Sequence, residues 1–361
     1  MTIILVIGIL VLLIITHEFG HFIAAKISGV KVQEFGVGYP PRAFRFGKVG
    51  DTEYTLNWIP FGGFVRLFGD EGETSEQGKG SFVNAPVGKR AFILVAGVVM
   101  NMLIAWMLFT SALHMGIPRA VDTGGPGVRL LISDVVSGSP ADSAGIRPGD
   151  ELVGMNDQSN QGPGELSPEN IATFVSNEGG QKIKLEYLRN GKESSVTMVP
   201  ANAVIPGAPG RAALGIGLVF VSSQPLSWSE AATSACLEIA NAFTRVVMDV
   251  GSIIGNALRG GLNLSGVVGP VGLVSVVGEA AQTGFAQVLA LAAFISVNLA
   301  VINLIPIPAL DGGRLVILGV EALMRRPAPK LAIHVLNLVG VAAILFLMVV
   351  VTYHDIARLV A

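Results

Sequence analysis

Four stretches of the chain are apolar over the roughly 20 residues that a membrane-spanning helix needs. The first runs from about residue 3 to 25, and the second runs from about 91 to 113. The third covers about 288 to 310, and the fourth covers about 331 to 351. This pattern predicts a polytopic α-helical membrane protein with about four transmembrane helices.

The composition supports a membrane protein. Hydrophobic residues make up 51% of the 361 residues, and charged residues make up 14%, whereas soluble domains carry about 25% charged residues. A net charge of −2 gives no reason to expect nucleic-acid binding. The single cysteine, Cys236, excludes a disulfide within the chain.

The pattern changes between the second and third apolar stretches. Short β-rich runs separated by Gly, Pro and Asn fill 127–222, and Arg189–Lys192 has the composition of a hairpin turn. This segment predicts a folded α+β domain inserted between the spans. In the following segment, 227–285, charged residues are spaced among apolar ones up to about residue 258. We expect an amphipathic helix there, lying at the outer membrane face.

Lysine and arginine placement predicts the orientation of the spans, because such residues are enriched in cytoplasmic loops. Basic residues follow the first span, precede the second, and recur between the third and fourth. Both connections are therefore expected in the cytoplasm. The amino terminus, the inserted domain and the carboxyl terminus would face outward.

The sequence His17-Glu18-Phe19-Gly20-His21 is an H-E-x-x-H motif within the first span. On a helix, positions i and i+4 share a face, so both imidazoles can reach one metal ion. Glu18 lies about 100° round the helix, where it could accept a proton from a water on the metal. The motif also arises by chance, but ionisable side chains inside a span are costly and usually functional.

A catalytic zinc site takes three protein ligands and keeps one open position. Asp311 follows the third apolar run and is the expected third ligand, because a carboxylate at that depth needs a partner. Pro306 and Pro308 interrupt the helix before it, and glycines follow it. The alternative is an ordinary helix end with an exposed capping aspartate.

Together, H-E-x-x-H and the N-x-x-P-x-x-x-L-D-G sequence that begins at Asn303 resemble the site-2 proteases, specifically the bacterial RseP type. The resemblance implies one Zn²⁺ per chain, held by His17, His21 and Asp311, with Glu18 as the catalytic base. It also implies that Asn303 contacts the substrate, and Asn298 is a further candidate for binding substrate backbone.

Three other segments extend the resemblance. Gly62, Gly63 and Phe64 match the signature of a re-entrant β-hairpin in this family, with short β-prone runs on both sides of 60–63. The resemblance implies that they bind substrate, because an exposed strand edge could hold the opened segment by main-chain hydrogen bonds; an ordinary cytosolic hairpin is the alternative. The segment 138–150 resembles the signature of bacterial PDZ domains, and 265–272 resembles the stretch before the family's third span. The candidate PDZ peptide groove is formed by Leu214, Gly215, Ile216 and Gly217.

The resemblance therefore implies an intramembrane zinc endopeptidase of the bacterial cytoplasmic membrane. Its expected partners are the lipid bilayer and transmembrane protein substrates, with anti-sigma factors or signal-peptide remnants as candidates. The expected organisation is 1–113 with H-E-x-x-H and the β-loop, 127–222 as an extracytoplasmic PDZ domain, 227–285 at the outer face, and 288–361 with the second motif. The active site would lie towards the cytoplasm, and the PDZ domain would filter or bind substrates.

The chain departs from the tandem-PDZ form of the family, because only one PDZ signature is present and Arg314 replaces a histidine. Two other functions stay open. One is an inactive relative that binds membrane clients. The other is a metal transporter, although such proteins usually contain repeated halves.

Overall fold

The computed structural model describes residues 1–69, 78–156, 162–202, 212–261, 267–326 and 328–360. The chain divides into two compact units. The first, the helical unit, comprises Met1–Met115 and Leu226–Ala361. The second, the inserted unit, comprises Gly116–Pro225.

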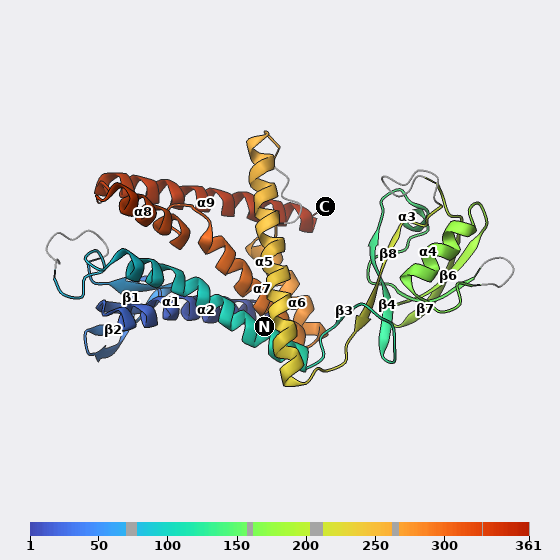
Figure 1. Ribbon diagram of the computed structural model, residues 1–361, viewed down its shortest axis with the longest axis horizontal. Helices are drawn as coiled ribbons and strands as arrows, with labels where there is room; N and C mark the ends of the chain where they lie inside the picture. Colours follow the sequence, from blue (N-terminus) through green and yellow to red (C-terminus); the bar gives the residue numbers. More distant parts are fainter. Residues whose placement is uncertain (70–77, 157–161, 203–211, 262–266, 327, 361) are drawn as a thin grey trace. The chain divides into compact units, whose positions relative to one another are not determined.

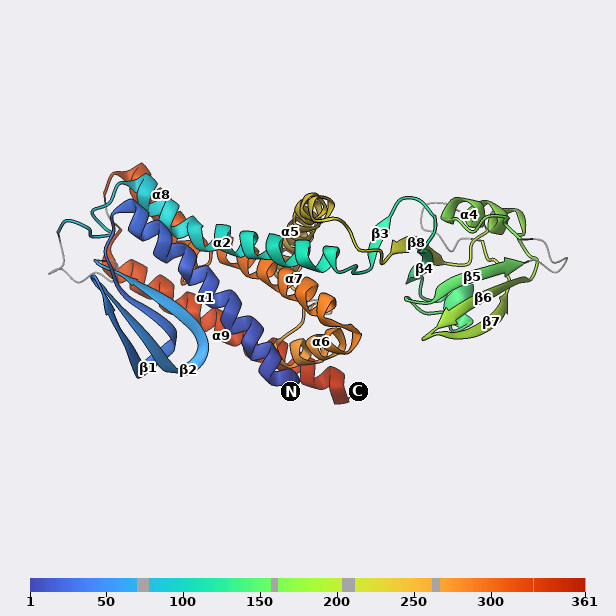
Figure 2. The same ribbon diagram turned by 90° about the horizontal axis from the view of Figure 1, so that it is seen from below.

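Within the described residues, four helices of the helical unit are long and apolar enough to cross a membrane. They are α1 (Thr2–Ser28), α2 (Val87–His114), α7 (Phe285–Leu304) and α9 (Lys330–Val360). The four predicted spans are thereby confirmed as helices (Figures 1 and 2). The third ends at Leu304, short of the expected residue 310, because prolines follow directly.

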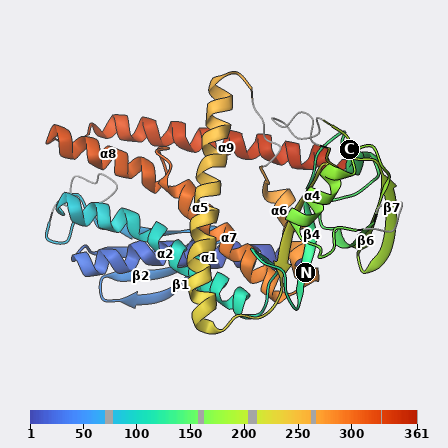
Figure 3. The same cartoon turned by 45° about the vertical axis from the view of Figure 1, so that its right-hand side comes forward.

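Helix α5 (Trp228–Leu258) runs crosswise to α2 and α7 in the helical unit (Figures 1 and 3). Trp106 of α2 donates its indole N–H to the Ala232 carbonyl at 3.0 Å, and the His114 ring stacks on Trp228 with centroids 4.0 Å apart. Ala231 is buried completely. The amphipathic helix expected after the inserted segment is therefore present, and one face packs against the bundle.

Helix α6 (Pro270–Thr283) begins within the 265–272 stretch, of which residues 265 and 266 lie outside the described residues. The backbone N–H groups of Gly269 and Gly272 donate to the buried Asp355 carboxylate of α9, at 3.2 and 2.8 Å. A Cβ at Gly269 would lie 2.6 Å from Asp355 Oδ2. Glycine there lets the carboxylate reach the helix N-terminus, where it is stabilised.

Two long bent strands, β1 (Val32–Val49) and β2 (Thr52–Leu67), pair with each other in a sheet beside α1 (Figure 2). Phe35 faces both Val65 and Tyr54, so the first half of β1 lies between the two halves of β2. The runs on either side of 60–63 therefore do not pair with each other as a hairpin about that point. The first half of β1 separates these runs, because it pairs in parallel with 53–56 and antiparallel with 63–67. Strand β2 therefore turns back near 60–63, and the chain also reverses at residues 50–51.

The inserted unit is a six-stranded sheet with two helices. Its elements are β3 (Arg119–Val121), β4 (Val128–Val135), α3 (Pro140–Ser143), β5 (Glu151–Asn156), α4 (Pro168–Asn177), β6 (Ile183–Arg189), β7 (Lys192–Met198) and β8 (Ile216–Ser222). The strand order is β3-β8-β4-β5-β6-β7. Asn190 and Gly191 join β6 to β7 with φ of 53° and 76°, which confirms the predicted hairpin turn.

The sequence Arg147-Pro-Gly-Asp150 forms a turn that is fixed by its last residue. The Asp150 carboxylate is 2% exposed. It accepts two hydrogen bonds of 2.7 Å from the Arg189 guanidinium and one of 2.9 Å from the Arg147 backbone N–H. Burial acts to raise the pKa of Asp150, but these hydrogen bonds hold it below its ordinary value. The turn thus ties α3 and β5 to β6.

Candidate metal centre

Three side chains from two distant segments bring one ligand atom each to a common point. His17 Nε2 and His21 Nε2, from α1, lie 3.2 Å apart. Asp311 Oδ2, from the first residue of α8 (Asp311–Met324), lies 3.1 Å from His17 Nε2 and 3.2 Å from His21 Nε2. Both histidines are buried. The structure therefore brings all three predicted ligands together.

This triangle has the size that a zinc site requires. Ligand atoms about 2.0–2.1 Å from one tetrahedral zinc lie about 3.3 Å from each other. The observed edges of 3.1–3.2 Å are close to that value. Two imidazoles and one carboxylate also form a typical catalytic zinc donor set, with one position left open. Within the described residues, this is the one group of three or more such side chains clustered closely enough to hold a metal.

The turn between α7 and α8 brings Asp311 to the histidines. Backbone carbonyls of this turn approach Gly312 and Gly313 so closely that a Cβ at either position would overlap them. From α9, Asn337 Oδ1 accepts a hydrogen bond of 3.2 Å from the Ala309 backbone N–H. Gly340 packs directly against the Pro308 carbonyl. The glycines of the motif are thus explained by close packing, and α9 supports the turn from outside.

The histidines fit against α2 because two glycines allow a close approach. A Cβ at Gly97 would lie 2.6 Å from His17 Cε1 and closer still to His21 Nε2. Gly20, inside the H-E-x-x-H motif, packs against the Ala96 backbone carbonyl. Small residues permit such helix contacts in membranes. Gly97 was not predicted from the sequence, where a glycine in an apolar span was its only signal.

A backbone carbonyl of α2 orients His21. Its Nδ1 lies 2.8 Å from the Ile93 carbonyl oxygen, which can only accept a hydrogen bond. Nδ1 therefore carries the proton, and the lone pair of Nε2 faces His17 and Asp311. A metal-binding histidine is usually held by such a hydrogen bond through its other nitrogen. This contact was also not predicted, because the sequence does not reveal which carbonyl faces the ring.

Glu18 lies between the candidate metal ligands and strand β2. The Val65 backbone N–H lies beside its carboxylate, which also interacts electrostatically with both histidines and Asp311. A Cβ at Gly63 would lie 3.2 Å from Glu18 Cγ. The edge of β2 that includes Gly63 and Val65 therefore lies against the carboxylate.

The predicted Gly62-Gly63-Phe64 signature is part of this strand. Gly62 has a φ of 108°, and the Tyr39 ring lies so close to it that a Cβ would meet Tyr39 Cδ2 at 2.8 Å. The Phe64 ring covers Gly36, where a Cβ would lie 2.7 Å from Phe64 Cζ. The signature thus sets the shape of the sheet at the point where it passes Glu18.

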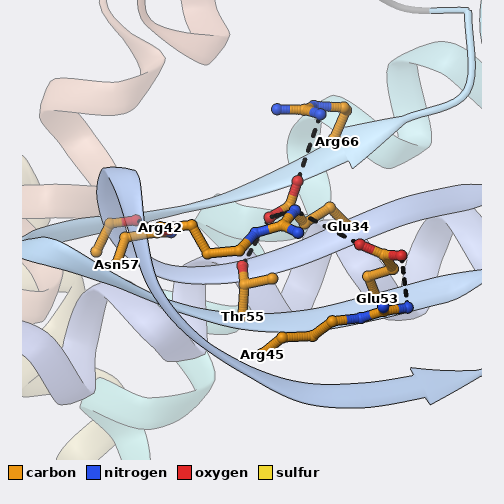
Figure 4. Close-up of polar contacts among 8 residues, drawn as sticks. Glu34, Arg42, Arg45, Glu53, Thr55, Asn57 and Arg66 are labelled. Carbon is orange, nitrogen blue, oxygen red and sulfur yellow. Dashed lines mark hydrogen bonds and ion pairs between the residues drawn. The ribbon is translucent and has the colours of Figure 1, made fainter.

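A chain of ion pairs joins all four segments of this sheet (Figure 4). The buried Glu34 carboxylate accepts hydrogen bonds from Arg42 at 3.1 Å and Thr55 at 2.7 Å, and it lies 3.3 Å from Arg66. Arg42 also pairs with Glu53 at 3.5 Å. Glu34, Arg42, Thr55 and Arg66 come from four different stretches of β1 and β2, so Glu34 connects the bent strands across the sheet.

The two predicted asparagines of α7 lie on different sides of that helix. Asn298 donates to the Phe294 carbonyl of its own helix at 2.8 Å. Asn303 is in the last turn of α7 and is half-buried. Residues five positions apart are about 140° apart round a helix. The two side chains therefore do not present a shared face.

The inserted unit contains a groove between β8 and α4. All four predicted residues, Leu214–Gly217, line it, together with Ile171 and Val175 of α4. Its volume is about 430 Å³. Within the described residues, β3 pairs only with 220–222 of β8, so the rest of that edge of β8 has no partner strand.

Comparison with known proteins places this geometry in a family. The model of peptidase family M50 matches residues 4–347. A "putative zinc metalloprotease" of Clostridium perfringens is 33% identical over 95% of each chain. A similarly named protein of Nostoc sp. is 31% identical over 91% of this chain and 89% of its own. Zinc metalloprotease RasP of Geobacillus kaustophilus is 26% identical over 96% and 95%. This chain therefore belongs to peptidase family M50, the site-2 proteases, and is a membrane zinc metalloendopeptidase.

Proposed function

We propose that this chain hydrolyses peptide bonds within the transmembrane segments of other membrane proteins, using one zinc ion held by His17, His21 and Asp311. The observation that carries the proposal is the triangle of their ligand atoms, with edges of 3.1–3.2 Å, inside a bundle of apolar helices. When bound, zinc acts as a Lewis acid and lowers the pKa of a water at its open position towards about 7.

Glu18 acts as the general base and then as the general acid. Its carboxylate takes the proton of the attacking water and returns it to the leaving amide nitrogen, which needs a proton before the bond can break. The Val65 N–H lies beside the Glu18 carboxylate and can stabilise its charge between the two transfers. His21, oriented by the Ile93 carbonyl, keeps its lone pair directed at the site.

Strand β2 presents the substrate. Peptide bonds in an intact helix are internally hydrogen-bonded, so a substrate helix must open before water can attack. An opened segment can pair by main-chain hydrogen bonds with a sheet edge, and the Gly63–Val65 stretch lies against Glu18. We assign this sheet as the family's re-entrant β-hairpin. Asn303 and Asn298 are proposed to bind substrate backbone from α7, which requires Asn298 to release the Phe294 carbonyl.

The inserted unit is proposed to be a PDZ domain on the extracytoplasmic side of a bacterial cytoplasmic membrane. The Arg147–Asp150 turn and the groove at Leu214–Gly217 support the domain type. Basic residues after α1 and before α2 support a cytoplasmic location for that connection, and hence an active site towards the cytoplasm. Anti-sigma factors and signal-peptide remnants are candidate substrates.

The proposed function is tested with the purified chain in lipid vesicles together with a model transmembrane peptide. Chelation should abolish cleavage of the peptide, and added zinc should restore it. An inactive relative would bind the peptide without cutting it, and a transporter would carry zinc across the vesicle without cutting it. Either pattern would overturn the endopeptidase assignment.

Removal of the inserted unit should preserve the chemistry and relax the selection of substrates. Leu113 accepts a hydrogen bond of 3.3 Å from the Leu226 backbone N–H, so the helical unit itself holds the two ends together. Deleting 116–225 and joining the ends with a short flexible linker should retain cleavage of a minimal transmembrane peptide. It should also permit cleavage of substrates with intact outer domains. Paired assays of trimmed and untrimmed substrates check both expectations.

A groove variant separates filtering from peptide capture. Ala172 is exposed and lines the groove, so Ala172→Trp should fill it, whereas Thr173→Trp on the same helix is a control outside the groove lining. If the domain acts as a filter, both variants cleave like the native chain.

The deletion has a further outcome. A folded, zinc-loaded deletion that cannot cut even the trimmed peptide would show that the inserted unit belongs to the catalytic machinery.

A further inference from the structure

One amide side chain inside the bundle has no hydrogen-bond partner. Asn101 of α2 is 0% exposed, and within the described residues neither Oδ1 nor Nδ2 meets a donor or acceptor. Its backbone carbonyl is fixed separately, by a 2.8 Å hydrogen bond from Ser296 of α7. A buried polar group without a partner destabilises the fold. An asparagine at this position therefore requires an explanation.

The candidate metal centre contains a second buried atom without a partner. His17 Nδ1 has no partner in the described part of the chain, whereas the matching atom of His21 contacts the Ile93 carbonyl. Histidines that bind a metal through Nε2 almost always donate from Nδ1 to an acceptor. Of the two histidines, only His17 lacks such an acceptor.

The packing of α1 on α2 places His17 and Asn101 on neighbouring turns of the two helices. His21 contacts Ile93, and His17 contacts Gly97. The two helices are therefore antiparallel, and moving four residues towards the start of α1 corresponds to moving four residues towards the end of α2. Asn101 lies one turn beyond Gly97, about 6 Å along the axis and about 40° round it. Side chains lean towards the N-terminus of their own helix. In this antiparallel pair, His17 and Asn101 therefore lean towards each other.

We propose that Asn101 is a positioning residue for His17. Its amide oxygen accepts the Nδ1 proton of the imidazole, directly or through one water, when zinc occupies Nε2. Asn101 thereby performs for His17 the role that the Ile93 carbonyl performs for His21, holding the ring in the tautomer that binds metal. This inference rests on the proposed function, because it takes His17 as a zinc ligand.

Zinc affinity, measured by competition with a chelator of known strength, tests the proposal. Asn101→Leu should weaken zinc binding about 10–100-fold, which is the usual effect of losing such a partner. Asn101→Asp keeps an oxygen acceptor and should bind zinc within about threefold of the native chain. Because leucine removes an unsatisfied polar group, the zinc-free Asn101→Leu chain should be at least as thermally stable as the native one. If the role of Asn101 were only to pack the two helices together, the zinc-free Asn101→Leu chain would be less stable than the native chain.

Thr110 provides the matched control. It lies on the same helix, is buried, and its hydroxyl also lacks a partner within the described residues. It is 13 residues from Gly97, or about 20 Å along the axis. Thr110→Val should therefore leave zinc affinity unchanged.

A spectroscopic measurement is independent of the affinity assay. With Co²⁺ in place of zinc, the proton NMR spectrum should show two strongly shifted exchangeable signals, one from each ligand Nδ1–H. Asn101→Leu should alter one of them. Native zinc affinity in Asn101→Leu, or equal losses in the leucine and aspartate variants, would overturn the role of Asn101. Zinc binding that survives His17→Ala would instead overturn the proposed metal site itself.

Discussion

Glu18→Gln should leave the chain folded and zinc-loaded while lowering its turnover by about 10²–10⁴-fold, the usual contribution of a general base. Glutamine has nearly the same shape, and its carbonyl oxygen can still face the Val65 N–H. It cannot take a proton from water at neutral pH. The expected result is a lower kcat on a transmembrane peptide with unchanged metal content.

The control for this substitution is Glu279→Gln, on the exposed side of α6 in the same unit. It should cleave like the native chain. If Glu18→Gln retained activity within about threefold, another group would have to supply the base. If its zinc disappeared together with its activity, Glu18 would be acting on metal binding rather than on proton transfer.

Asp311→Ala should remove nearly all bound zinc and abolish activity. Only two of the three ligand atoms would remain, and two imidazoles do not complete a catalytic zinc site. We expect zinc affinity to fall by more than about 100-fold, because losing a residue that only hydrogen-bonds a metal ligand already costs up to about 100-fold. Metal analysis of the purified variant measures this directly.

Asp355→Asn is the matched control for Asp311→Ala. Asp355 is another buried carboxylate of the helical unit, but it binds the backbone at the start of α6. Its amide variant should keep a full complement of zinc even if its stability falls. Undiminished zinc in Asp311→Ala would exclude Asp311 from the ligand set and leave the third ligand unassigned.

The sequence predicted the four spans and the metal motif because both depend on local spacing. A run of about 20 apolar residues is long enough to cross the hydrocarbon core of a bilayer as a helix. The i, i+4 spacing of His17 and His21 places them on one face whatever surrounds the helix. Asp311 could not be paired with them by spacing alone, since 294 residues separate it from His17. That pairing came from the need for a third ligand and from the resemblance.

The β-sheet shows where sequence reasoning was insufficient. Alternation and turn residues indicate strands, but they do not show that one strand bends and pairs twice. Phe35 faces both Val65 and Tyr54, and the buried Glu34 gathers side chains from the other three segments. Such pairing depends on long-range register, which a local pattern cannot determine.

The surroundings of the metal site were also beyond prediction from the sequence. In the sequence, Gly97 and Asn101 are ordinary residues of an apolar span. Every residue has a backbone carbonyl, so the sequence does not show that the Ile93 carbonyl faces His21. The importance of Gly97 and the Ile93 carbonyl comes from the close packing of α1 on α2, where the histidines contact them. Glycine and asparagine within an apolar helix were the only local signals. Small and polar residues there often mark helix contacts.

Mass-spectrometric mapping of the bond that is cut tests the central claim most directly. The zinc-loaded chain in lipid vesicles is given a transmembrane protein substrate, and the new termini of its products are identified. We expect the cut to fall inside the apolar segment of the substrate, to disappear on chelation, and to return with zinc. A cut confined to the soluble part of the substrate, or one that persists without zinc, would contradict intramembrane zinc proteolysis.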